Sequence, residues 1–145
     1  MGTWGSGAYT LTLGEYVPPV PVTGNDTCSD AFEITADGSW SGDTTGMTHT
    51  VDGSCGYGGA RDAWFTFTLS SASHVILDTM DSALDTVLYV ISGTCSGAEL
   101  ACDDMSGPGM TSRLELDLDP GTYYVVVDGY YHTYYDDYIL TVSGL

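Results

Sequence analysis

The sequence predicts an all-β domain, an antiparallel β-sandwich of about eight short strands braced by disulfides. Apolar and polar residues alternate with a period of two from residue 60 onward, and turn residues recur at intervals of roughly 8–12 residues. Helical periodicity is lacking, and only residues 29–34 could form a helical turn. Four cysteines supply the disulfides.

The first part of this pattern contains four strand segments. β-Branched and aromatic residues dominate each segment, which favours strands over helices. A serine-rich turn follows the first segment, an acidic loop follows the second, and Ser92-Gly93-Thr94 ends the third. The segments are residues 63–69, 74–78, 85–91 and 99–102.

Three further segments complete the predicted sandwich. Residues 113–118 alternate strictly, which predicts a strand with one face in water. Asp119-Pro120-Gly121 is a tight-turn signal. Residues 122–128 are so apolar that we expect a central position in a sheet, and residues 138–142 form the last strand.

The charge of the chain excludes several classes of partner. Asp and Glu total 20 against 2 for Lys and Arg, a formal net charge of −18 at pH 7. Nucleic acids and anionic membranes attract basic patches, so we expect neither as a partner. The absence of lysine excludes Schiff-base and P-loop lysine chemistry. No apolar run reaches the length of about 18 residues expected of a membrane-inserted segment.

The four cysteines predict an extracellular or cell-surface location, because disulfides persist in oxidising compartments. Four cysteines permit three pairings. Their spacing favours the local pairs Cys28–Cys55 and Cys95–Cys102, each worth roughly 2–4 kcal/mol through restriction of the unfolded chain. No spacing fits a structural zinc site.

Aspartates are concentrated where the predicted strands begin or end. If consecutive strands run antiparallel, these ends meet at one pole, with almost no basic residue to pair with. Calcium takes about six to eight oxygen ligands and would relieve the repulsion, so we expect Ca²⁺ as a cofactor. The alternative is that these side chains cap turns and solvate the surface. The expected ligands are Asp78, Asp81, Asp85, Asp103 and Asp104, and the other strand-end aspartates are Asp128, Asp136 and Asp137.

A tyrosine-rich segment before the last strand is a candidate ligand or interface loop. Tyrosine rings can stack on sugar rings while carboxylates bind the hydroxyl groups, so the loop could bind glycans. It could equally form a contact with another module, because tyrosine provides large area at low entropic cost. The residues are Tyr130, Tyr131, Tyr134, Tyr135, Asp136 and Asp137.

The beginning of the chain repeats its end. Tyr9, Leu11 and Leu13 follow the pattern of residues 138–142. This first segment is therefore either the terminal strand of a preceding repeat or a donor strand that completes a neighbouring subunit's sheet. Both interpretations make neighbouring copies of the module its partners. The expected divisions are residues 1–14 for this strand, 15–24 for a proline-rich linker and 25–145 for the sandwich.

The sequence contains a possible modification motif but no recognisable catalytic motif. Asn25-Asp26-Thr27 is a glycosylation sequence, which makes Asn25 a possible attachment site. Gly-x-Ser-x-Gly and His-Glu-x-x-His are absent, and His49, His74 and His132 stand in no recognisable catalytic context. We therefore expect no enzymatic activity.

Five segments in order resemble the bacterial pre-peptidase C-terminal domain family, particularly its cysteine-bearing versions. The resemblance implies a jelly-roll-like β-sandwich without catalytic activity, attached to secreted proteases or repeated in bacterial surface proteins. It also implies that some relatives bind calcium and a polymeric substrate. Collagen binding does not carry over, because the collagen-binding relatives lack this cysteine arrangement. The segments are residues 25–31, 62–67, 85–90, 102–104 and 120–130, of which Pro120-Gly121-Thr122-Tyr123-Tyr124 is the most specific.

Two functions follow from these expectations. The first is a non-catalytic extracellular structural or adhesive module, stabilised by calcium and repeated or assembled into an elongated surface fibre. The alternative is a substrate-binding accessory module of a secreted hydrolase, which holds polysaccharide or protein in its tyrosine-rich loop.

Overall fold

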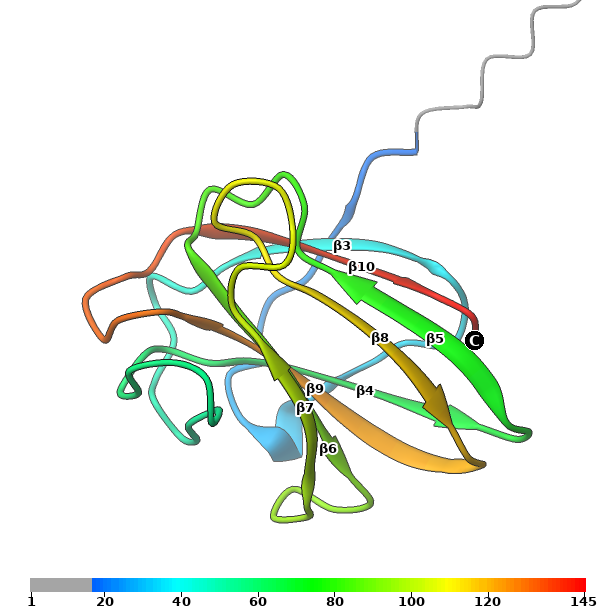
Figure 1. Ribbon diagram of the computed structural model, residues 1–145. Helices are drawn as coiled ribbons and strands as arrows, with labels where there is room; N and C mark the ends of the chain where they lie inside the picture. The colour runs from blue at the N-terminus through cyan, green and yellow to red at the C-terminus, as the bar shows by residue number, and fades with distance from the viewer. Residues whose placement is uncertain (1–16) are drawn as a thin grey trace, which may run out of the picture.

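The computed structural model describes residues 17–145, which form two five-stranded β-sheets packed face to face (Figure 1). The prediction of an all-β sandwich is confirmed. A single 3₁₀ turn, η1 (Cys28–Asp30), precedes β2 in this part of the chain. The first sheet has the order β1 (Val20–Pro21), β3 (Gly38–Asp43), β10 (Asp137–Ser143), β5 (Ser73–Asp78) and β8 (Arg113–Leu118). The second has the order β2 (Phe32–Glu33), β4 (Ala63–Leu69), β9 (Gly121–Gly129), β6 (Thr86–Ser92) and β7 (Glu99–Asp103).

The strands with alternating or continuously apolar sequences were predicted well, and the three strands before residue 60, which have neither pattern, were missed. All segments predicted from residue 63 onward are strands, with ends that differ by at most one residue. β3 escaped prediction because its sequence is Gly-Ser-Trp-Ser-Gly-Asp, in which Trp40 is the one strong strand former. β1 and β2 have two residues each and join β3 and β4 in parallel. β1 lies within the range that the sequence assigned to a linker.

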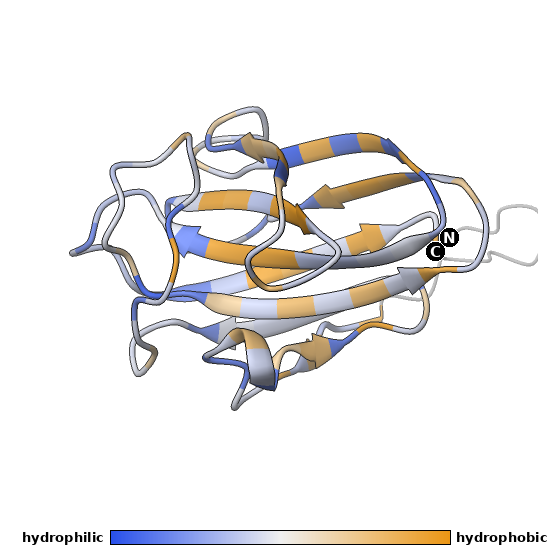
Figure 2. Ribbon diagram, turned by 90° about the horizontal axis from the view of Figure 1, so that it is seen from below, coloured by the Kyte–Doolittle hydropathy of each residue, from blue (hydrophilic) through white to orange (hydrophobic). Residues whose placement is uncertain are grey.

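The main core lies between the two sheets. Phe65 and Phe67 of β4 and Leu140 of β10 are fully buried there, while their strand neighbours face the other way. Figure 2 shows the resulting alternation of apolar and polar residues along the strands. The ring of Phe65 meets that of Tyr138 edge to face at 6.1 Å, which joins the sheets directly.

A second, smaller core covers the outer face of the second sheet. Trp64, Tyr89 and Val126 are buried there under the loop of residues 44–62, which contributes Val51 and Cys55. β9 is therefore buried on both faces, as expected for a continuous apolar strand between β4 and β6. This covering loop is central to the site described below.

The disulfides differ from the predicted local pairs. Cys28 is bonded to Cys95, and Cys55 is bonded to Cys102, with Cα–Cα distances of 5.9 and 5.8 Å. Cys95 lies at the tip of the β6–β7 hairpin, whereas Cys102 is inside the ladder opposite Tyr89, so the hairpin separates them. The prediction was wrong because loop 44–62 crosses the sheet and brings Cys55 to β7.

Two further expectations from the sequence concern the first segment of the chain and membrane-spanning segments. The assembly strand with Tyr9, Leu11 and Leu13 lies outside the described residues. Within residues 17–145, no helix is long and apolar enough to cross a membrane.

Candidate functional site

Four tyrosines from two loops form one aromatic group, which we call the tyrosine cluster. Tyr57 belongs to loop 44–62, and Tyr130, Tyr131 and Tyr134 belong to the loop between β9 and β10. Tyr57 stacks on Tyr131 at 4.5 Å with an interplanar angle of 23°, and it meets Tyr130 edge to face at 5.1 Å. Tyr131 also meets Tyr130 at 4.9 Å and Tyr134 at 5.1 Å. Sequence reasoning found three of these tyrosines but missed Tyr57, which is distant in the chain.

The tyrosine cluster remains accessible to solvent. Tyr57 is 67% exposed and Tyr134 is 40% exposed. Beside the cluster, the guanidinium of Arg61 lies 3.9 Å above the ring of Tyr135, a cation–π contact. Arg61 also donates a hydrogen bond to the carbonyl of Thr45. One of the two basic residues of the chain thus holds this loop in place.

A small pocket opens next to Tyr134 and Tyr135. Its volume is about 270 Å³, and its lining residues include Asp85 and Asp136 together with the two tyrosines. Burial, and after it the nearby carboxylate of Asp104, raises the pKa of Asp85. The pocket, which we call the acidic aromatic pocket, therefore brings hydrogen-bond acceptors to an aromatic surface.

The expected calcium ligands lie at the end of the sandwich that also carries the acidic aromatic pocket. Two of them, Asp78 and Asp103, accept hydrogen bonds from nearby backbone amides. Asp78 accepts a hydrogen bond from the Met80 amide at 3.0 Å. Asp103 accepts bonds from the amides of Ser106 and Arg113 at 3.0 and 2.8 Å. These are the capping roles that the sequence left open as the alternative.

The remaining expected ligands do not complete a metal-binding group. Asp81 is exposed and has a left-handed backbone (φ 70°) in the turn after β5. The charge of Asp104 is near enough to contribute to the raised pKa of Asp85, after the larger effect of burial. Across the described residues, no three His, Cys, Asp or Glu side chains are arranged to hold a metal ion. Calcium binding stays a prediction.

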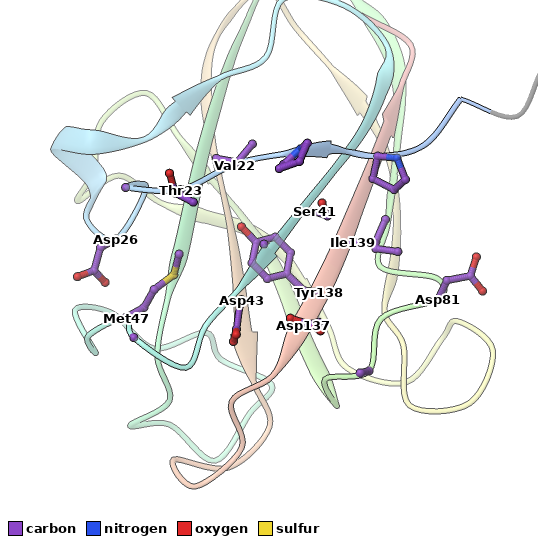
Figure 3. Close-up of a pocket in the computed structure, with 16 residues that line it drawn as sticks. Val22, Thr23, Asp26, Ser41, Asp43, Met47, Asp81, Asp137, Tyr138 and Ile139 are labelled. Carbon is purple, nitrogen blue, oxygen red and sulfur yellow. The ribbon is translucent and has the colours of Figure 1, made fainter.

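A larger groove of about 950 Å³ lies where the chain enters the sandwich (Figure 3). Its lining includes Pro21 and Val22, Ser41 of β3 and Ile139 of β10. Asp137, which the sequence grouped with the tyrosine-rich loop, lines this groove instead of the acidic aromatic pocket. Sequence reasoning missed the groove because it depends on the pairing of β1 with β3. Its lining also includes Asp26, Asp43 and Asp81.

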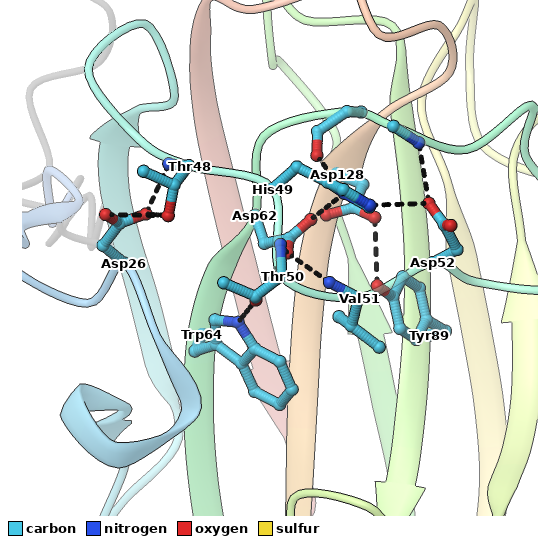
Figure 4. Close-up of polar contacts among 12 residues, drawn as sticks. Asp26, Thr48, His49, Thr50, Val51, Asp52, Asp62, Trp64, Tyr89 and Asp128 are labelled. Atoms are coloured by element: carbon cyan, nitrogen blue, oxygen red, sulfur yellow. Dashed lines mark hydrogen bonds and ion pairs between the residues drawn. The ribbon is translucent and has the colours of Figure 1, made fainter.

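Asp62, the last residue of loop 44–62, and Asp128 of β9 form a pair of buried carboxyl groups beneath the rest of this loop (Figure 4). Asp62 is 0% exposed and Asp128 is 4% exposed. One oxygen of Asp62 accepts hydrogen bonds from the Thr50 and Val51 amides at 2.5 and 2.8 Å. One oxygen of Asp128 accepts a bond from the Tyr89 hydroxyl at 3.0 Å. Sequence reasoning placed Asp128 among the strand-end aspartates of the acidic pole and assigned no role to Asp62.

Asn25 is a structural residue in the folded domain. Asn25 is 1% exposed, and its Nδ2 donates a hydrogen bond to the Trp64 carbonyl at 3.1 Å. In return, the Trp64 amide donates to the backbone carbonyl of Asn25 at 2.8 Å. The side chain is therefore held inside the folded domain, and glycosylation of Asn25 stays a prediction.

Comparison with known proteins gave a family and a fold. The model of the family GBD_T9SS_assoc, described as "Galactose binding domain-like", matches residues 24–127. A solved structure, the pre-peptidase C-terminal domain of a collagenase from Bacillus anthracis, is similar with a TM-score of 0.56 and 16% identity. The similarity covers 89% of this chain and 100% of that one, and at this identity it concerns the fold alone. No curated protein matches this chain.

Proposed function

This chain belongs to the galactose-binding-domain-like family whose model matches residues 24–127, and we propose that it is a non-catalytic accessory module of a secreted bacterial protein, with a glycan site at its tyrosine cluster. The acidic aromatic pocket carries this proposal. A sugar ring presents apolar C–H faces and a rim of hydroxyl groups. Tyr134 and Tyr135 can pack against the apolar faces of the sugar. Asp85 and Asp136 can accept hydrogen bonds from its hydroxyl groups.

The size of the pocket favours a short ligand. Its volume of about 270 Å³ is close to the lower end of the usual range for ligand pockets, roughly 300–1,000 Å³. One sugar ring would occupy it, and further rings would lie along the exposed tyrosine cluster. The larger groove beside β3 is less suited to a sugar, because the one aromatic ring in its lining, that of Tyr138, is fully buried.

Secretion and an accessory role have separate support. Two disulfides are typical of proteins in oxidising compartments, and the family name refers to an association with the type IX secretion system. A non-catalytic role is supported by the use of the buried carboxyl groups, since Asp62 holds backbone amides instead of facing a cleft.

The test is a binding titration of galactose and a panel of other mono- and oligosaccharides, followed by calorimetry or by amide NMR shifts. Tyr134→Ala and Asp136→Asn should each weaken binding by about tenfold or more, the equivalent of 1.4 kcal/mol. Asp117→Asn, an exposed change on β8, is the matched control and should bind as the wild type does. Binding that is unaffected by both pocket variants, or no binding across the panel, would contradict the proposal.

Assembly with neighbouring copies remains a second candidate, favoured by the position of β10. Residues 9–13 share the pattern of β10, which lies inside the first sheet between β3 and β5. A preceding repeat would use such a strand internally, and a strand-donating neighbour would need an open sheet edge such as β8. Light scattering of the full chain and of a variant lacking residues 1–14 separates these alternatives, because only a donated strand would make multimers depend on that segment.

A further inference from the structure

Asp62 and Asp128 are cross-strand neighbours on the outer face of the second sheet. Ala63 pairs with Val127 at the end of the β4–β9 ladder, and Asp62 and Asp128 are the residues that come directly next to this pair. Because side chains alternate, these two carboxyl groups lie on the same face as Trp64 and Val126. Loop 44–62 covers them there (Figure 4).

Each carboxyl group has one satisfied oxygen and one buried oxygen without a partner. The Oδ2 of Asp62 accepts the Thr50 and Val51 amides and the Thr50 hydroxyl, and the Oδ2 of Asp128 accepts the Tyr89 hydroxyl. Within the described residues, the Oδ1 of each has no hydrogen-bond donor. Two ionised carboxylates in this position would repel each other, and their Oδ1 atoms would remain without donors.

We propose that Asp62 and Asp128 share one proton and that this protonated pair is an acid-dependent latch that holds loop 44–62, and with it Tyr57, against the end of β9. A hydroxyl on Oδ1 of Asp128 would donate to Oδ1 of Asp62, which provides a partner for both oxygens in a single bond. Ionisation of both groups removes that bond and leaves two adjacent anions.

The surrounding groups favour the protonated form. Burial, followed by the neighbouring Asp62 carboxyl, raises the pKa of Asp128 well above its usual range. Asp52, in the covering loop, adds further negative charge. Tyr89 acts in the opposite direction, because the hydroxyl that it donates from β6 favours the ionised form of Asp128 and lowers its pKa. Burial raises the pKa of Tyr89 itself, so its own hydroxyl remains neutral.

One basic side chain faces the pair. His49 Nδ1 lies 3.9 Å from Oδ1 of Asp62, and its Nε2 lies 3.7 Å from Asp52. Nδ1 is also 2.9 Å from the carbonyl of Ala60, which can only accept, so Nδ1 carries a hydrogen and donates it there. His49 must therefore be tested separately as a source of pH dependence.

Both members of the latch, Asp62 and Asp128, are connected to the tyrosine cluster. Asp62 holds the Thr50–Val51 part of the covering loop, and the same loop continues to Tyr57, whose amide donates to the Tyr130 carbonyl at 3.1 Å. Asp128 is two residues before Tyr130 in the chain. Opening of the latch should therefore loosen the stack of Tyr57 on Tyr131. Only this effect on the tyrosine cluster rests on the proposed function. The shared proton itself can be tested whether or not the domain binds glycans.

The direction of the pH effect follows from linkage. An acid whose pKa is higher in the folded state binds more protons there than in the unfolded chain. Its contribution to stability is therefore present at low pH and declines as the pH rises from the ordinary Asp value, about 3.9, through the raised folded value. Above that value the contribution no longer changes.

The decisive measurement is an NMR titration of the side-chain carboxyl carbons in the full-length protein, labelled at Asp and followed from pH 3 to pH 9. The Asp128 signal should move in a step well above pH 4, and the Asp62 signal should register the same step, because the shared proton is bonded to both groups. Completion of the Asp128 step in the ordinary Asp range, or an Asp62 signal that does not respond to it, overturns the proposal. A shift of both signals on addition of calcium, with no step above pH 4, overturns it in favour of a cation.

Variants then test whether the shared proton accounts for the pH dependence of stability. Asp128→Asn supplies a permanent donor to Asp62 with little change in shape, so its melting temperature should lose the decline above pH 4 that the wild type shows. Asp52→Asn and His49→Gln remove the neighbouring charges and should keep that decline. A decline that persists in Asp128→Asn, or disappears in His49→Gln, contradicts the latch. If Asp128→Asn does not fold, the wild-type carboxyl titration still decides the matter.

Discussion

The ring of Tyr57 stacks on that of Tyr131 at 4.5 Å and so joins the loop before β4 to the loop after β9. Both loops are anchored close to this contact. The disulfide from Cys55 to Cys102 ties one of them to β7, and Arg61 reaches from its end to the ring of Tyr135. A surface that could bind a ligand is thereby assembled from segments that are far apart in the sequence.

Removal of the Tyr57 ring should loosen this surface without unfolding the sandwich. We expect Tyr57→Ala to lower the free energy of unfolding by about 1 kcal/mol, since aromatic pairs contribute roughly 0.5–1.5 kcal/mol beyond burial. Urea denaturation measures the change, and near-ultraviolet circular dichroism should show the altered tyrosine environment. Tyr57→Phe keeps the stack and should remain close to the wild type. Equal stability of all three proteins would mean that the stack contributes nothing.

The crossed disulfides lead to a direct chemical test. Peptide mapping without reduction should recover Cys28 linked to Cys95 and Cys55 linked to Cys102, and recovery of the local pairs would contradict the fold of loop 44–62. Replacement of Cys55 and Cys102 together by Ser should cost about 2–5 kcal/mol, because the bond closes a long loop of the unfolded chain. Thermal denaturation under oxidising conditions measures this loss.

Gly42 of β3 should tolerate no side chain. A Cβ at this position would meet the ring of Tyr138, which is fully buried and cannot move aside. We expect Gly42→Ala to destabilise the domain by about 1–3 kcal/mol, the usual cost of overpacking. Gly46→Ala is the control, since a Cβ there meets no atom within 4 Å. Similar melting temperatures for the two variants would show that the β3–β10 contact is looser than described.

The expected calcium site can be tested at Asp85 and Asp104. If a cation lies between these carboxylates, calcium should raise the melting temperature of the wild type, and chelation should lower it again at constant ionic strength. Asp104→Asn should abolish the response, whereas Asp30→Asn, an exposed change on η1, should leave it intact. A melting temperature that is insensitive to chelation would contradict the calcium prediction.

Only part of the candidate site could be predicted from the sequence. Tyr130 to Tyr135 and Asp136 stand together in the chain, so their composition alone marked the loop. Tyr57 and Asp85, in contrast, reach the same surface through the covering loop and the start of β6. The burial of Asp62 beside Asp128 was likewise invisible, because it requires both the pairing of β4 with β9 and the loop that covers this pair.

The sequence by itself determined where the strands from residue 63 onward lie, because alternation and turn residues are local properties that each segment carries alone. It also determined the acidic, cysteine-containing character of the domain. The tertiary structure alone decided which cysteines bond, which aspartates are buried and which tyrosines meet. Those relationships depend on the order of strands in a sheet and on the path of loop 44–62, and both arise from contacts between residues that are distant in the chain.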